Sequence, residues 1–391
     1  MRTPRTMCKF RVTNRLGILV FLVIILFLPL PGCGTDLTIT SPLDHQVFQR
    51  QTQDQGIVTI QGKTPNPADS VEAEFTGQSI SGKLPGTWSP SKLDKITGVF
   101  HADLPTPAGG FYVLKIRVIH NREVSEMSVR HVGVGEVFVV SGQSNSTNYG
   151  EVRQKTKSGM VTAKSSEGWQ IANDPQPAVQ DDSSQGSFIP SFGDAMFEKY
   201  GVPIGVISVG HGSTSVRQWL PKGTPVQVMP TYQKYVYNDP SGVLLSDGVL
   251  YANMVAQLKL LGKGGFRAVL SHQGESDSNQ PEGNNITADT YKEMMHSLIA
   301  NERLDVGWDF PWFVAEATYQ SPYVQSCPSI QRAQQSLWED GISLQGPNTD
   351  ALTMQYREKK GRGIHFNDAG LKLHGKLWFQ QVSAYLDSEV R

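Results

Sequence analysis

The sequence predicts a two-part α/β protein, in which a small antiparallel β-sandwich precedes a larger domain with a parallel sheet. Two observations lead to this expectation. Short apolar runs separated by turn residues fill the stretch from Asp36 to about Val132, and from Val134 onward apolar strands alternate with amphipathic helical stretches. The first pattern is typical of all-β modules and the second of parallel α/β sheets. A chain of 391 residues is long enough for both parts.

Residues 1–34 have the pattern of an export signal. Basic residues between Arg2 and Arg15 precede an apolar stretch from Leu16 to Leu30, which is shorter than the ~20 residues of a membrane span. The sequence Leu30-Pro-Gly-Cys33 resembles a bacterial lipobox, in which the cysteine is lipidated and becomes the first residue of the mature protein. We therefore expect an exported lipoprotein of a bacterial envelope, anchored to the membrane through Cys33. Ordinary cleavage, giving a periplasmic or secreted protein, and an uncleaved anchor are the alternatives.

Charge and cysteine usage narrow the class of protein. The formal net charge of -1 gives no electrostatic reason to expect nucleic-acid binding. The chain has three cysteines, and only Cys327 lies beyond the lipobox. One thiol cannot form an intramolecular disulfide, and no Cys/His motif indicates structural zinc. We expect Cys327 to be a buried, unreactive thiol.

Residues 35–132 are expected to form a β-sandwich of immunoglobulin-like type. Their apolar runs are short and are separated by Gly, Pro, Asn and Asp at the spacing of such folds. The predicted strands are Leu37–Thr40, Ile57–Ile60, Val71–Phe75 and Tyr112–Val118. No catalytic constellation occurs in this part. We expect it to be a structural module or spacer, with sugar binding as the alternative.

Residues 133–391 are expected to form the catalytic α/β domain. The predicted strands are Val137–Ser141, Ile204–Val209, Phe266–His272 and Trp312–Ala317. The predicted helices are 191–200, 250–261, 288–301, 329–339 and 369–386. Several strands are continuous apolar runs, as expected when helices cover both faces of a parallel sheet. Chemistry in such folds gathers at the carboxyl ends of the strands.

Three segments near predicted strand or helix ends carry reactive side chains. In Val139-Val-Ser-Gly-Gln-Ser-Asn145, a strand runs into a glycine turn followed by Ser144. In Leu270-Ser-His-Gln-Gly-Glu-Ser-Asp277, four polar side chains crowd behind another strand. In Gly363-Ile-His-Phe-Asn-Asp-Ala-Gly370, His365 lies just before a predicted helix start. Each segment alone also fits an ordinary hydrogen-bonded loop.

Together, these motifs resemble those of the SGNH hydrolases, and within them the group of sialate O-acetylesterases and acetylxylan esterases (carbohydrate esterase family six). Gly142-Gln-Ser-Asn145, the segment from His272 to Asp277, and the segment from His365 to Gly370 match motifs of that group in the same order. Further likeness lies in 202–207, 210–219 and 330–334, so the resemblance covers about residues 134–386. It implies a three-layer α/β/α, flavodoxin-like catalytic domain.

The resemblance implies a serine esterase that removes O-acetyl groups from carbohydrates through an acetyl-enzyme, without a metal or organic cofactor. It assigns Ser144 as nucleophile, His365 as general base and Glu275 as the acid that orients the histidine. The oxyanion hole would consist of the N–H groups of Ser144 and Gly212 and the side chain of Gln273.

One position departs from the superfamily pattern. Many SGNH hydrolases carry an aspartate three residues before the histidine, and this chain has Arg362 there. A guanidinium cannot accept a hydrogen bond from the imidazole. The esterases that this chain resembles take the acid from the motif between His272 and Asp277, so the resemblance assigns Glu275, with Asp350 and Asp277 as the alternatives.

Two further residues are candidates for substrate binding. Asn145 follows the nucleophile and is expected to brace its loop, and Trp219 either stacks on a sugar or belongs to the core. The expected partner is an acetylated carbohydrate, but the sequence does not identify the sugar. The competing functions are an esterase of lipid-like or small esters and a non-catalytic, glycan-binding surface lipoprotein.

Overall fold

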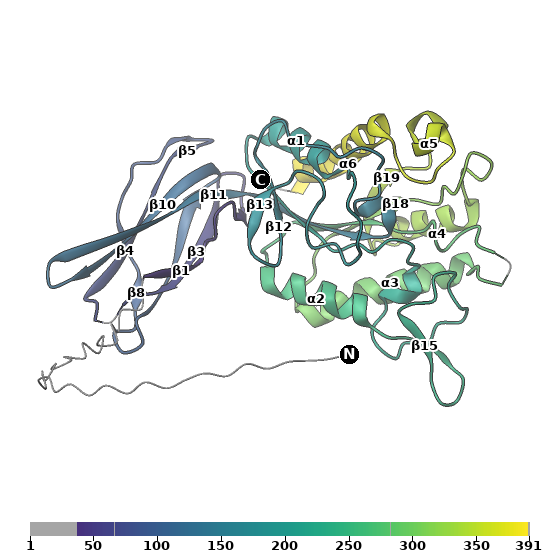
Figure 1. Cartoon of the computed structure of the whole chain (residues 1–391), viewed down its shortest axis with the longest axis horizontal. Coiled ribbons are helices and arrows are strands. Elements are labelled where there is room, and N and C mark those ends of the chain that lie inside the picture. Colours follow the sequence, from purple (N-terminus) through teal and green to yellow (C-terminus); the bar gives the residue numbers. More distant parts are fainter. Residues whose placement is uncertain (1–36, 66, 282, 390–391) are drawn as a thin grey trace, which may run out of the picture. The chain divides into compact units, whose positions relative to one another are not determined.

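The computed structural model describes residues 37–389 except 66 and 282. The export signal and Cys33 lie outside this range, so their assignments stay predictions. The described residues form a mixed α/β structure with a four-stranded sheet, a two-stranded ribbon and a large mixed sheet of thirteen strands (Figure 1). Within the described range, no helix has the length and apolar character needed to cross a membrane.

The N-terminal third consists of strands. The four-stranded sheet has the order β1-β3-β9-β8, and β4, β10 and the first half of β11 pair antiparallel in the large sheet. All four predicted strands are present, and sequence reasoning missed β9, which carries two prolines. The bounds are β1 (Thr38–Ser41), β2 (Val47–Gln49), β3 (Gln55–Lys63), β4 (Ser70–Thr76), β5 (Gln78–Ser79), β6 (Gly82–Lys83), β7 (Ser89–Pro90), β8 (Lys92–Leu93), β9 (Val99–Pro107), β10 (Gly109–His120) and β11 (Glu123–Gly142).

Strand β11 runs through the predicted boundary at 132/133. Its first half pairs antiparallel with β10, and its second half, from Glu136, pairs parallel with β14 and β17. The exposed first residues give way to a continuously buried run from Val132 to Gly142. One strand therefore leads from the β-rich part directly to the turn that carries Ser144.

The C-terminal part of the large sheet has the order β13-β12-β14-β11-β17-β18-β19. All neighbours in it are parallel except β13, which pairs antiparallel with β12. The bounds are β12 (Val161–Lys164), β13 (Trp169–Ile171), β14 (Ile204–Ser208), β17 (Ala268–His272), β18 (Trp312–Glu316) and β19 (Leu344–Asn348). The parallel strands bring the loops that follow Gly142, Ser208 and His272 to one edge of the sheet.

Helices pack on both faces of these strands. Alternate strand residues, such as Phe138 and Val140, join a core cluster with α1 (Ile189–Tyr200) and α6 (Asp368–Glu389). Their neighbours, such as Val137 and Val139, join a second cluster with α2 (Val249–Leu261), α3 (Ala288–Val306) and α4 (Pro328–Glu339). The period-two alternation of buried residues explains why the sheet needs cover on both sides. All five predicted helices and all four predicted strands of this part are present.

The remaining elements lie in the loops. They are the ribbon β15 (Val236–Asn238) and β16 (Leu244–Ser246), the 3₁₀ turns η1 (Ser144–Ser146), η2 (Val216–Trp219) and η3 (Met354–Tyr356), and the short α5 (Glu358–Gly361). Three of them, η1, η2 and α5, hold residues of the motifs described above or lie next to them.

Candidate active site

Ser144 lies in a tight turn directly behind β11. Gly142 has φ +119°, and a Cβ there would overlap the backbone carbonyl of His272, so only glycine fits this position. The Gln143 N–H donates to the His272 carbonyl at 2.9 Å, which fixes the turn to the neighbouring strand β17. Among the described residues, neither the Ser144 hydroxyl nor its N–H has a hydrogen-bond partner. Both groups are therefore available to a substrate.

His365 is paired with Glu358. The two atoms His365 Nδ1 and Glu358 Oε1 are 2.9 Å apart, and the Glu358 N–H donates to the His365 carbonyl at 2.8 Å. Both side chains are mostly buried, with 18% and 12% of their surface exposed. The hydrogen bond from His365 holds the pKa of Glu358 below its ordinary value. Since Nδ1 donates to the carboxylate, Nε2 is left to accept a proton.

Gly363 makes room for this pair. A Cβ at position 363 would overlap Glu358 Cγ. Arg357 holds the same segment through a hydrogen bond from its guanidinium to the Ile364 carbonyl at 2.7 Å. The guanidinium itself stacks on the rings of Tyr319 and Phe366. The loop that carries the histidine is therefore fixed on both sides of His365.

The expectation that Glu275 orients His365 is wrong in this structure. The Glu275 carboxylate accepts instead from His272 Nε2 at 2.7 Å and from Asn145 Nδ2 at 2.9 Å. His272 in turn contacts His374 at 3.3 Å, and Trp378 donates to His374 at 3.0 Å. Burial would raise the pKa of Glu275, but His272 and Asn145 outweigh it and hold the pKa below the ordinary value. Glu275 is thus part of a buried hydrogen-bond network that includes Asn145, the residue after Ser144.

The loops of Ser144 and His365 meet through their neighbours. Asn145 Nδ2 lies 3.4 Å from the Ile364 carbonyl, and the Tyr149 ring lies 5.0 Å from the His365 ring. No hydrogen bond joins Ser144 to His365 among the described residues. Catalytic hydrogen bonds are often long before substrate binds. The structure thus brings the two loops together, and Asn145 lies between them, in contact with Glu275 and Ile364.

The predicted oxyanion donors differ in availability. The Gly212 N–H donates to Asp181 Oδ2 at 2.5 Å, so this predicted donor is already occupied by a carboxylate. The Gln273 side-chain nitrogen lies 2.8 Å from both the Thr214 carbonyl and Asp277. The amide hydrogens of Gln273 are therefore used within the protein. The expectation that Gln273 donates to the oxyanion is not met in this structure. The Ser144 N–H is free, as noted above.

Three other candidates have structural contacts. Trp219 is 1% exposed, donates to Thr214 at 2.9 Å and belongs to the core under α2, so stacking on a sugar is excluded for it in this structure. Asp350 accepts from the Thr318 and Tyr319 N–H groups. Asp277 accepts from Ser215 and Val216. Neither alternative acid faces His365. Cys327, expected to be buried, is partly exposed at the start of α4.

Sequence reasoning missed several residues around His365. Glu358 lies seven residues before the histidine, outside the motif spacing, although the glycines at 361 and 363 indicate a tight turn there. Tyr149 follows the nucleophile motif, and a Cβ on Gly212 would overlap its ring. His211 contacts the rings of Tyr232 and Tyr235, with centroids 5.7 and 5.1 Å away. His211 lies in the segment 210–219 that carries part of the family resemblance, but no motif marks Tyr149, Tyr232 or Tyr235.

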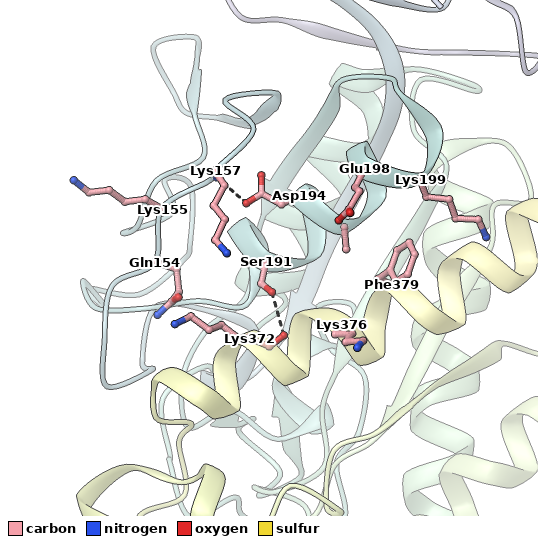
Figure 2. A pocket seen from close by; sticks show the side chains of 11 residues that line it. Gln154, Lys155, Lys157, Ser191, Asp194, Glu198, Lys199, Lys372, Lys376 and Phe379 are labelled. Atoms are coloured by element: carbon pink, nitrogen blue, oxygen red, sulfur yellow. Dashed lines mark hydrogen bonds between the residues drawn. The ribbon is translucent and has the colours of Figure 1, made fainter.

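A lysine-lined cavity of about 540 Å³ lies between α1, α6 and residues 154–157. Figure 2 shows Lys157 and Lys372 extending into this region, with the Lys157 N–H donating to Asp194 and Ser191 donating to the Lys372 carbonyl. Lys372 is paired with Asp368 and Lys199 with Asp387. None of the lining residues is a triad candidate, so this cavity is separate from the site described above.

Comparisons with known proteins found a matching family model and similar structures. Residues 134–384 match the family model described as carbohydrate esterase, sialic acid-specific acetylesterase. A carbohydrate acetylesterase from Xanthomonas citri has a similar structure, with a TM-score of 0.54, 17% identity, and coverage of 89% of this chain and 74% of that chain. A protein from Arabidopsis thaliana aligns with a TM-score of 0.42 and 18% identity over 65% of this chain and 98% of its own. No curated protein sequence matches significantly.

The family match covers well over half of the chain and contains all three motifs. The Xanthomonas structure independently supports the fold. The chain therefore belongs to the family of sialic acid-specific acetylesterases among the carbohydrate esterases, and it is an esterase that acts on O-acetylated carbohydrates.

Proposed function

We propose that Ser144, His365 and Glu358 are the catalytic triad of this esterase. The observation that carries the proposal is the hydrogen bond between His365 and Glu358 beside the turn of Ser144. A serine hydroxyl is a poor nucleophile near neutral pH, and an adjacent base must accept its proton. His365 has a carboxylate on Nδ1 and no hydrogen-bond partner on Nε2 among the described residues, whereas both ring nitrogens of His272 are occupied, by Glu275 and His374.

In the first step, Ser144 Oγ attacks the acetyl carbonyl carbon while His365 Nε2 takes the hydroxyl proton. The tetrahedral intermediate then collapses, the bond to the sugar oxygen breaks, and His365 returns the proton to that oxygen. Water repeats the sequence on the acetyl-enzyme and releases acetate. Glu358 holds the ring in the required tautomer and stabilises the imidazolium without being protonated itself.

The Ser144 N–H is the first donor to the oxyanion. The Gly212 N–H joins it when the acetyl oxygen takes the place of the Asp181 carboxylate. An oxyanion-hole donor is typically worth on the order of 10²–10³ in turnover. The substrate must therefore displace Asp181 to obtain full stabilisation.

The sugar is proposed to lie against the aromatic side chains near Gly212. Tyr149, His211, Tyr232 and Tyr235 offer apolar faces with polar edges, the usual composition of a site for a small polar ligand. The similar structure from Xanthomonas citri is that of a carbohydrate acetylesterase, which agrees with such a substrate. The identity of the acetylated sugar is the property to be measured.

The fold type of each part of the chain and the cellular location of the protein are also proposals. We infer an immunoglobulin-like N-terminal module, supported by its short antiparallel strands, and a three-layer, flavodoxin-like catalytic domain, supported by the helices on both sheet faces. The basic and apolar N-terminus and the lipobox-like Cys33 support export as a bacterial lipoprotein.

Acetate release tests the proposed function. Purified protein is incubated with acetylated xylan, pectin and O-acetylated sialic acids, with Ser144→Ala as control, and p-nitrophenyl acetate serves as a general substrate. The proposal expects acetate from at least one carbohydrate and none with Ser144→Ala. Faster turnover of long acyl esters would favour a lipid-like substrate, and equal inactivity of both proteins would favour a binding protein.

A further inference from the structure

We propose that Asp44, His45 and His131 form a binding site for a divalent transition metal of the zinc type, remote from the reaction chemistry. Within the described residues, these three are the group whose potential ligand atoms all lie within 4.8 Å of one another. Neither histidine belongs to the motifs that define the esterase site, and the contacts described for that site do not include them.

Chain topology brings the three residues together. Asp44 and His45 lie in the turn between β1 and β2, and His131 lies in β11. Strand β2 pairs with β11, with Val47 opposite Gly133, so the turn is placed next to His131. His45 and His131 are 86 positions apart in the sequence, which explains why no sequence motif reveals the cluster.

The donor atoms converge on one point. His131 Nδ1 lies 2.8 Å from Asp44 Oδ1, and His45 Nδ1 lies 3.3 Å from the same oxygen. Ligand atoms about 2.0–2.2 Å from a tetrahedral zinc are separated from each other by roughly 3.3–3.5 Å. The His45–Asp44 distance of 3.3 Å matches this spacing, and the His131–Asp44 distance of 2.8 Å is that of a direct hydrogen bond, so His131 would move outward slightly to admit an ion. A tetrahedral ion held by these three ligands would have one position left for water.

The rings are held with their Nδ1 edges toward the carboxylate. The two imidazoles are stacked with centroids 4.2 Å apart, and Phe111 packs edge-on against both at 5.8 Å. His45 and His131 have φ values of +64° and +54°, in the left-handed region that non-glycine residues rarely adopt. Two such residues facing one carboxylate indicate that the surrounding structure fixes this arrangement.

The donor set selects the class of metal. Two imidazoles and one carboxylate suit zinc and its neighbours, whereas Mg²⁺ and Ca²⁺ prefer oxygen ligands. Binding would release the protons that the Nδ1 atoms carry in the hydrogen-bonded state. A bound ion would join the β1–β2 turn to β11, the strand that continues to Ser144, and would therefore stabilise the fold.

Calorimetric titration of untagged, full-length protein with ZnCl₂ tests this site, since an affinity tag of histidines would itself bind metal. The expected result is saturable binding near one zinc per chain and a higher melting temperature with Zn²⁺ than with Mg²⁺. His45→Asn and His131→Asn should weaken the binding by about tenfold or more, because asparagine tolerates the left-handed backbone but removes the imidazole.

His101→Asn is the matched control. His101 pairs with Asp103 at 3.1 Å in the same part of the chain, but the pair has no third ligand and is not part of such a group. It should bind zinc as the wild type does. Equal zinc affinity in His131→Asn and wild type, or no saturable binding at all, would overturn the proposal. Retained hydrolysis of p-nitrophenyl acetate by each variant shows that it is folded.

Discussion

The Glu358 carboxylate lies 2.9 Å from His365 Nδ1, and the backbones of the same two residues are joined by a second hydrogen bond of 2.8 Å. This double connection fixes the position of the acid relative to the imidazole. It also replaces the pairing that the sequence motifs predict, because Glu275 is held by His272 and Asn145. The two glutamates therefore have different partners, Glu358 with His365 and Glu275 with the buried His272.

Glu358→Gln and Glu275→Gln should affect different properties. Glu358→Gln keeps the shape but removes the charge that orients His365, so kcat should fall on the order of 10³–10⁴. Glu275→Gln breaks a buried pair and should cost about 3 kcal/mol of unfolding free energy, with a much smaller loss of kcat per folded molecule. Hydrolysis of p-nitrophenyl acetate and urea unfolding of both variants check this. The reverse pattern would restore Glu275 as the acid.

Gly363→Ala should displace Glu358 from His365. The added Cβ would overlap Glu358 Cγ, and a misplacement of about 1 Å can cost on the order of 10²-fold in rate. Position 363 has no left-handed φ, so the substitution introduces crowding rather than backbone strain. Glu358→Ala removes the Cγ atom that the new methyl group would overlap. Gly363→Ala should therefore cost little unfolding free energy when it is added to Glu358→Ala, and unfolding of the single and double variants measures this. A fully active Gly363→Ala enzyme would contradict this account of the pair.

Asp181→Ala should raise kcat/KM severalfold, up to about tenfold. The substitution frees the Gly212 N–H from a charge-assisted hydrogen bond, and such bonds are worth roughly 1.5–3 kcal/mol. Asp182→Ala removes a neighbouring, exposed carboxylate and is the matched control for charge, because the Gly212 N–H donates to Asp181 and not to Asp182. Steady-state kinetics of both variants on p-nitrophenyl acetate decide the matter. A loss of activity in Asp181→Ala alone would mean that Asp181 positions the loop instead.

The Glu358–His365 pair should stabilise the fold in a pH-dependent way. The folded pKa of Glu358 lies below its ordinary value because of the hydrogen bond from His365. Its contribution is therefore fully present above the unfolded pKa of about 4.3 and is lost as pH falls through the lower folded value. Urea unfolding should show that wild type and Glu358→Gln differ at pH 6 and converge in acid. Glu339→Gln, which removes an exposed partner of Arg332, should leave stability nearly unchanged.

The sequence was most informative where local pattern and burial agree. Continuous apolar runs such as Ile204–Ser208 and Trp312–Glu316 are fully buried strands, as expected for a sheet covered on both faces. Strand β19 was not predicted, because it contains Gly346 and Pro347, two residue types that are uncommon inside strands. The domain boundary was also less distinct than expected, because β11 continues through it without a linker.

The carboxylate that contacts His365, Glu358, could not be found from motif spacing. Glu358 reaches His365 only because Lys359 and Lys360 adopt left-handed φ values and turn the chain back on itself. Such a turn depends on tertiary packing, including the buried Arg357 beneath it. Trp219 was named as a possible sugar contact because it lies near Gly212 in the sequence. In the structure its ring belongs to the core. Its position in the sequence near Gly212 did not show that its side chain points into the core.

A double-mutant cycle between His365 and Glu358 tests the central claim most directly. Initial rates of p-nitrophenyl acetate hydrolysis are measured for wild type, His365→Ala, Glu358→Gln and the double variant. If Glu358 acts through His365, its loss should have almost no further effect once the imidazole is gone. A double variant in which the two losses multiply would show that Glu358 does not act through His365.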